Sequence, residues 1–259
     1  MRTLRGVVLL SLFTPSIVLL GCSKPEDPAA LHRALGNEHA RKAEWAVAAK
    51  EYGLSAQANP RDRKVWELKA NAHIRLGEVR EAAESLVKPA EYTSDPNAKA
   101  ESYRLAASLY VENREFLEAE KAFAEALRFA PRDELSLSWL GEFASARGGA
   151  RSMTDPPDAV WLEKAIGYYD RAISVNPNNL FAYVNKRIAI NKYIVFEEQE
   201  RALANRLIHL EHKDASRVAA AEARLNDATT RIEDFKKEID KLNKKIIEFR
   251  APQKANHTS

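Results

Sequence analysis

The feature that most constrains this 259-residue chain is a set of small and large side chains that recurs 34 residues further on. In the first copy, small Gly36 and Ala48 would let two helices approach each other, and large Tyr52 would fill the gap to the next pair of helices. Equivalent residues recur in two further copies, as Ala70, Ala82 and Leu86, and then as Ala107, Ala119 and Phe123. A period of this length predicts repeated helix pairs that bury a continuous core only by stacking on one another.

The junctions between copies carry a second signal. Pro60, Pro131 and Pro177 would each end the second helix of a pair, and two residues later Asp62, Asp133 and Asn179 could cap the next helix through a side-chain oxygen. With its period and its small and aromatic positions, this pattern resembles the tetratricopeptide repeat (TPR). The resemblance implies a curved solenoid whose first helices line a concave, partner-binding surface.

Two units depart from the pattern. In the fourth unit, which begins near Leu137, residues 148–158 form an inserted loop that is either part of a binding face or plain length variation. The second unit has Lys69 where an apolar residue is usual, and the 37-residue step to the third unit indicates a small insertion around residues 88–97.

Composition supports an all-α protein. The chain has only 9 Gly and 11 Pro, 30% charged residues, and no alternating runs of β-branched side chains. We therefore expect an all-α, TPR-like α-solenoid of about four helix pairs over residues 29–179. A long helical hairpin or coiled coil should follow over residues 180–250, and residues 251–259 read as a disordered tail.

The amino terminus carries an export signal. Arg2 and Arg5 precede an apolar run too short for a comfortable membrane-spanning helix, and the run ends in Leu19-Leu20-Gly21-Cys22. This order resembles the bacterial lipoprotein signal. The resemblance implies removal of residues 1–21 and acylation of Cys22, the only cysteine. Residues 22–28 would then be a lipidated tether that ends where Asp27 caps a helix beginning at Pro28.

The predicted location follows from this signal. Ser23 stands where inner-membrane lipoproteins carry aspartate, so we expect an outer-membrane lipoprotein that faces the periplasm. The alternative is an ordinary secretory signal followed by an unpaired thiol. Without Arg2 and Arg5 the chain carries 38 basic against 37 acidic residues, so its charge gives no reason to expect nucleic acid as a partner.

Candidate binding residues lie on the predicted first helices. Arg33 with Asn37, and Asn71 with Arg75, are one turn apart and resemble part of the carboxylate clamp with which some TPR domains hold a partner's carboxy terminus. Glu101 and Glu112 weaken the likeness, and a solvated helix face is the alternative. The candidate groove residues are Arg33, Asn37, Arg41, Asn71, Arg75 and Arg104.

The last third of the chain carries a heptad pattern. Its apolar seam is Leu225, Ala228, Ile232, Phe235, Ile239, Leu242, Ile246 and Phe249. Parallel self-pairing would place Arg231 near Lys236 and Lys245 near Arg250, so we disfavour it. An intramolecular hairpin would turn near Glu211 and Asp214, with the first arm contributing Val184, Ile188, Tyr193, Phe196, Leu203, Leu207 and Leu210. A single rod that awaits a foreign helix is the competing arrangement.

No catalytic constellation is recognisable: the chain has no phosphate-binding loop, nucleophile elbow or zinc-spaced Cys/His set. His209 and His212 offer at most two metal ligands, fewer than a hydrolytic site needs. We expect no enzyme activity, cofactor, metal or small-molecule substrate. Two function classes stay open, a membrane-anchored scaffold for envelope proteins or peptides and a regulator of a periplasmic enzyme such as one acting on peptidoglycan, with a catalytic protein a distant third.

Overall fold

The computed structural model describes residues 27–149, 157–211 and 213–250. Ten α-helices follow one another in this part of the chain, and it contains no strand. Their bounds are α1 (Pro28–Arg41), α2 (Trp45–Ala58), α3 (Arg63–Leu76), α4 (Val79–Val87), α5 (Pro96–Glu112), α6 (Phe116–Phe129), α7 (Glu134–Gly148), α8 (Ala159–Val175), α9 (Leu180–Leu210) and α10 (Ala215–Arg250). A short 3₁₀ helix, η1 (Lys88–Glu91), follows α4.

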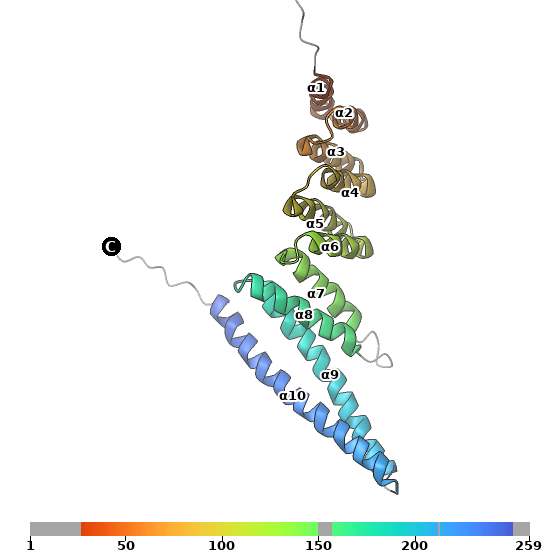
Figure 1. The fold of residues 1–259 in the computed structure, drawn as a ribbon, viewed down its shortest axis with the longest axis vertical. Helices are drawn as coiled ribbons and strands as arrows, with labels where there is room; N and C mark the ends of the chain where they lie inside the picture. Colours follow the sequence, from red (N-terminus) through yellow and green to blue (C-terminus); the bar gives the residue numbers. More distant parts are fainter. Residues whose placement is uncertain (1–26, 150–156, 212, 251–259) are drawn as a thin grey trace, which may run out of the picture.

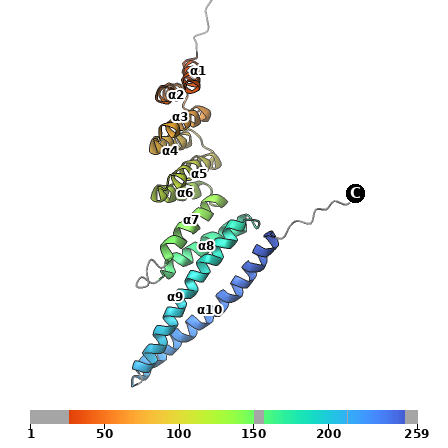
Figure 2. The same ribbon diagram turned by 180° about the vertical axis from the view of Figure 1, so that it is seen from behind.

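The helices form a column of pairs with a long two-helix extension (Figure 1). Successive pairs α1/α2, α3/α4, α5/α6 and α7/α8 lie one below the other, and each second helix also contacts the first helix of the next pair. We call α1–α8 the stack and α9–α10 the hairpin, which projects from the far end of the stack (Figure 2). The fold is therefore an all-α, TPR-like solenoid of four helix pairs followed by a long helical hairpin.

The predicted caps begin the first helices of the pairs. The Asp62 carboxylate accepts a hydrogen bond from the Lys64 backbone N–H, Asp133 from Ser136 and Asn179 from Ala182. Asp27 caps α1 in the same way, with Pro28 as the first helical residue. These side chains satisfy backbone donors that a helix start leaves without a partner, so the junction prediction is confirmed.

The turns inside the first three pairs each contain one residue in the left-handed conformation. Ala43, Gly77 and Arg114 occupy equivalent places and have φ values of 58°, 77° and 62°. This left-handed conformation suits glycine and costs other residues about 1 kcal/mol. Only the second pair uses glycine there, so the first and third turns carry backbone strain.

Two glycines show why small residues recur on the first helices. A Cβ on Gly36 would lie 2.6 Å from the Tyr52 ring, and one on Gly141 would lie 2.7 Å from the Tyr169 ring. Both tyrosines are buried on second helices, Tyr169 completely. The close approach of helices in the first and fourth pairs therefore depends on the missing side chain.

The long helical region folds back on itself as a hairpin and is not a single rod. Glu211 to Asp214 separates α9 from α10, and cross-pairs such as Tyr183–Phe249 and Tyr193–Phe235, with ring centroids 5.5 Å and 4.9 Å apart, run in opposite directions along the two helices. Every predicted seam residue of α10 is buried or half-buried, and α9 is the helix that α10 packs against.

The α9 side of the hairpin differs from the prediction. Ile188, Leu203 and Leu210 were expected in the seam, but each is exposed. The other predicted positions are buried or half-buried: Tyr193 is buried, and Val184, Phe196 and Leu207 are half-buried. The buried face also includes Lys186, Ile190 and Glu197. Apolar periodicity misplaced three of the seven residues because charged side chains on α9 are paired inside the interface.

A charged bridge holds the hairpin to the stack. The Lys186 ammonium, with its side chain 8% exposed, contacts Asp170 of α8 at 2.5 Å and also Glu238 of α10. Burial by itself would lower the pKa of Lys186, but hydrogen bonds to these two carboxylates raise it above its usual value. Arg231 of α10 similarly reaches Glu197 of α9 at 3.1 Å.

Several predictions fall outside the described residues. Cys22, the signal over residues 1–21, most of the tether, residues 150–156 of the inserted loop, His212 and the tail at 251–259 are among them. None of the helices described here combines the length and apolar character needed to cross a membrane. Over the same residues, no three or more His, Cys, Asp or Glu side chains are grouped to hold a metal ion.

Candidate peptide-binding groove

Three of the six predicted groove residues meet in one hollow. Asn37 and Arg41 of α1 and Asn71 of α3 line it, together with Trp45 and Tyr52 of α2, around a volume of about 650 Å³. The hollow lies between the first helices of adjacent pairs, where the TPR resemblance places the concave surface. Asn37, Arg41 and Asn71 are exposed and available to a partner.

The polar side chains of this hollow offer several hydrogen-bond donors, set among apolar residues that include Ala34, Ala40 and Leu68. The Tyr52 hydroxyl donates to Asn37 Oδ1 at 2.9 Å, which directs the Asn37 amide N–H groups away from Tyr52. Burial raises the pKa of Tyr52, so its hydroxyl keeps the proton that it donates. Among the described residues, the Arg41 and Asn71 side chains have no hydrogen bond or ion pair. The arrangement suits a ligand that accepts hydrogen bonds, above all a carboxylate.

Arg33 and Arg104 serve a different purpose from the one predicted. The Arg33 guanidinium binds Asp62, the cap of α3, at 3.0 Å, and Arg104 lies 3.6 Å from Asp133, the cap of α7. Each arginine thus joins one first helix to the start of the next. Their charges are neutralised within the stack, so neither offers a free cation to a ligand.

Arg75 lies at the edge of the hollow. Its guanidinium is 5.6 Å from the centroid of the Trp45 ring, and Trp45 itself lines the hollow. A cation over an aromatic face is attracted to it. Arg75 therefore lies close to the groove, and no carboxylate of the described residues forms an ion pair with it.

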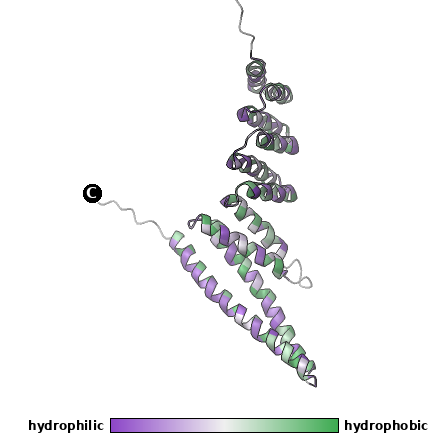
Figure 3. Ribbon diagram, viewed as in Figure 1, coloured by the Kyte–Doolittle hydropathy of each residue, from purple (hydrophilic) through white to green (hydrophobic). Residues whose placement is uncertain are grey.

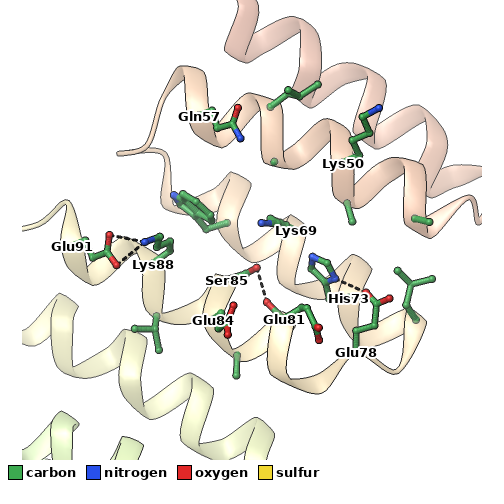
Figure 4. A pocket seen from close by; sticks show the side chains of 18 of the residues that line it. Lys50, Gln57, Lys69, His73, Glu78, Glu81, Glu84, Ser85, Lys88 and Glu91 are labelled. Atoms are coloured by element: carbon green, nitrogen blue, oxygen red, sulfur yellow. Dashed lines mark hydrogen bonds and ion pairs between the residues drawn. The ribbon is translucent and has the colours of Figure 1, made fainter.

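A larger hollow opens on the opposite side, between the second helices α2 and α4, with α3 as its floor. It has a volume of about 980 Å³. Figure 4 shows Lys50 and Gln57 on α2 facing Glu81 and Glu84 on α4 across Lys69, while His73 and Lys88 are already paired with Glu78 and Glu91. Lys69 also lies over the Trp66 ring, 5.5 Å from its centroid.

Sequence reasoning did not identify this second hollow. Its signal was Lys69, a charged residue at a position where the repeat usually has an apolar one, together with the short helix α4. The side chains around this hollow carry charges of both signs, so its electrostatics do not indicate one class of ligand.

Comparison with known proteins gives structural neighbours only. Neither a family model nor a curated protein matches the chain. Solved structures similar to it include a TPR repeats protein from Bacteroides fragilis, with a TM-score of 0.49 and 15% identity over 86% of this chain and 98% of that one. MamA protein aligns with a TM-score of 0.47 and 18% identity over 82% of this chain and 95% of that one. YrrB, described as a TPR protein with an unusual peptide-binding site, aligns with a TM-score of 0.43 and 13% identity over 75% of this chain and 92% of that one.

Proposed function

We propose that this chain is a non-catalytic scaffold that binds a carboxylate-bearing peptide of an envelope protein in the hollow between α1 and α3. The observation that carries the proposal is the convergence on one open hollow of donors from Asn37, Arg41 and Asn71 that have no acceptor among the described residues. A terminal or side-chain carboxylate would accept charge-assisted hydrogen bonds from these groups, and Arg75 would add positive charge at the edge.

The proposal also includes the cellular location of the scaffold. Acylation at Cys22 would hold the chain on a membrane, with the outer membrane and its periplasmic face as the proposed location. Two or more acyl chains anchor a protein stably, whereas a single chain binds a membrane only marginally. The support for this part is the sequence of residues 1–23 alone.

The groove is tested by crosslinking in cells. A photoreactive amino acid at Ala34, which is exposed in the hollow, should capture a defined set of proteins. Arg41→Glu in the same chain should abolish the capture because it places a negative charge where a carboxylate would bind, while Arg41→Lys should keep part of it. Capture that survives Arg41→Glu, or that is reproduced from exposed Lys121 on α6, would refute the groove as the binding site.

The anchor is tested separately. Cys22→Ser should remove the lipid anchor, because the thiol that would carry the lipid is gone. The protein should then either appear in the soluble fraction or keep residues 1–21 uncleaved. Replacing Ser23 with Ala serves as the control, since it leaves the thiol in place. A Cys22→Ser chain that has lost residues 1–21 and still remains in the membrane fraction would disprove the anchor without touching the groove proposal.

A further inference from the structure

The packing of α1 beside α3 is repeated further along the stack by α5 and α7. Arg33 of α1 binds Asp62, the cap of α3. The residues 71 positions further on are Arg104 of α5 and Asp133, the cap of α7, and they form the same kind of contact. The surface between α5 and α7 is therefore the counterpart of the hollow between α1 and α3, two helix pairs away from it.

Polar side chains on this second surface have the opposite character. Glu112 stands in the place of Arg41, and Glu142 stands in the place of Asn71. Glu112 is exposed, and among the described residues its side chain has no hydrogen bond or ion pair. Glu142 is half-buried and accepts a hydrogen bond from the Tyr169 hydroxyl at 3.2 Å through one of its two oxygens. Donors in the hollow are thus replaced by carboxylates.

The aromatic residue of the second surface is uncovered. Phe116 takes the place of Trp45, which lines the hollow and lies beneath the Arg75 guanidinium. Ala146 stands where the first hollow has Arg75, so Phe116 lacks such a cation and is 52% exposed. Its ring packs against Phe143, with centroids 6.3 Å apart. An exposed aromatic face attracts cations, as carboxylates do.

We propose that Glu112, Phe116 and Glu142, together called the acidic surface, bind a lysine or arginine side chain of the peptide whose carboxylate occupies the hollow between α1 and α3. The inference rests on the proposed function and deepens it, since it gives the peptide a charge pattern and a direction. The two carboxylates would accept charge-assisted hydrogen bonds, and the ring would contact the cation from its face.

Lys192 of α9 also reaches this part of α7. Its ammonium donates to the Ser145 carbonyl oxygen at 2.8 Å and to the Ser145 hydroxyl at 3.0 Å, one turn beyond Glu142. No ion pair joins it to Glu142, so that carboxylate can still meet a cation of the peptide. Lys192 nevertheless reduces the negative potential near Glu142. We therefore expect Glu112 to contribute more to binding than Glu142.

The separation of the two sites sets the length of the peptide. Packed helices lie about 8–10 Å apart, so surfaces two helix pairs apart are separated by about 20 Å. An extended chain advances about 3.3 Å per residue, which places the basic residue about six residues before the carboxylate. A peptide bound in the opposite direction would bring its terminal carboxylate to Glu112, where the two negative charges repel each other.

The charge pattern is tested with the purified full chain and a library of random peptides about ten residues long that end in a free carboxylate. An amidated copy of the library is the control for the terminus. Bound peptides should be enriched in Lys and Arg about six residues before the end. Glu112→Lys should change this preference to Asp and Glu while binding still requires the carboxylate. Glu222→Lys, the same charge change at an exposed position of α10, should leave the preference unchanged.

The size of the effect is measured with one enriched peptide by fluorescence anisotropy. Glu112→Lys should raise the dissociation constant about five- to tenfold, and Glu142→Gln, which keeps an acceptor for Tyr169, about two- to threefold. A copy of the peptide with Gln in place of the basic residue should bind the natural chain and both variants about equally. Circular dichroism checks that each variant keeps its helices.

The results separate failure of this inference from failure of the proposed function. Carboxylate-dependent binding without a basic preference, or with a preference that Glu112→Lys leaves unchanged, would refute the acidic surface and leave the hollow between α1 and α3 standing. Equal binding of free and amidated peptides, or binding that survives Arg41→Glu, would refute the hollow and this inference with it. A library from which no peptide is enriched would also refute both.

Discussion

The stack and the hairpin bury their side chains in different ways. Within the stack most helices lie between neighbours on both sides, and large side chains such as Phe123 and Tyr169 are completely enclosed. In the hairpin α10 packs against α9 alone, and its fully buried positions form a narrow row. Much of α10 is hydrophilic in Figure 3. Short helices in the stack are therefore buried by the neighbouring helix pairs. The hairpin, which projects from the stack, is instead held by one apolar seam and by ion pairs between its two helices.

The two regions also use polar residues differently. Polar side chains in the stack include the helix caps and the arginines that bind them, as Arg33 binds Asp62, and the buried ones are uncharged serines. In the hairpin, Lys186 and Glu197 lie inside the packed face. A stack can tolerate surface changes between its caps, while the hairpin should be sensitive to single charged residues.

The largest expected difference concerns aromatic truncation. Tyr169→Ala in the stack should lower the free energy of unfolding by about 4 kcal/mol, because it empties a completely buried site between α7 and α8. Phe235→Ala in the hairpin should cost about 1–2 kcal/mol, since that ring is only half-buried. Urea unfolding followed by circular dichroism measures both. Equal losses would remove the contrast between the regions.

The next largest effect concerns the bridge between the regions. Lys186→Ala should lower stability by about 2 kcal/mol, less than for a fully buried ion pair, because both carboxylates that it leaves can reach water. Amide hydrogen exchange should rise in α10 and stay unchanged in α1–α6. Lys241→Ala, an exposed lysine on α10, is the matched control. Faster exchange spread evenly over the whole chain would contradict a local bridge.

The same bridge predicts a pH dependence. The pKa of Lys186 is raised in the folded chain, so its stabilising contribution is complete below the ordinary value of 10.5 and is lost as the pH rises through the folded pKa. Melting temperatures of the natural chain and of Lys186→Ala should therefore differ by a constant amount from neutral pH to about pH 10 and converge above it. A gap that shows no decline as the pH rises above 10.5 would assign the stabilisation to packing instead of charge.

The smallest expected effects are those of replacing two glycines of the stack with alanine. Gly77→Ala should cost about 1 kcal/mol, because the turn holds this residue at a φ of 77°. Gly167→Ala, inside α8 with open space around it, should instead stabilise the chain by about 0.5–1 kcal/mol. Thermal melting distinguishes the two signs. A gain at Gly77 would mean that the turn does not need the left-handed conformation.

The candidate site was only partly predictable. Periodicity placed Arg33, Asn37, Arg41, Asn71, Arg75 and Arg104 on first helices, because backbone geometry repeats with the sequence. It could not separate Arg41, which has no hydrogen bond or ion pair with another described residue, from Arg33 and Arg104, which bind the caps of later helices. Those partners lie 29 residues away in each case, and only the packing of neighbouring pairs brings them into reach.

The sequence by itself determined the helix pairs, their caps and a long helical region after residue 180, because these follow from local hydrogen bonding and from the spacing of small and large side chains. The tertiary structure decided which face of α9 is buried. Lys186 and Glu197 enter the packed face because partners from other helices compensate their charges, and Ile188, Leu203 and Leu210 remain outside. Hydrophobic periodicity cannot show this, since it records the chemistry of a side chain and not the neighbour that compensates it.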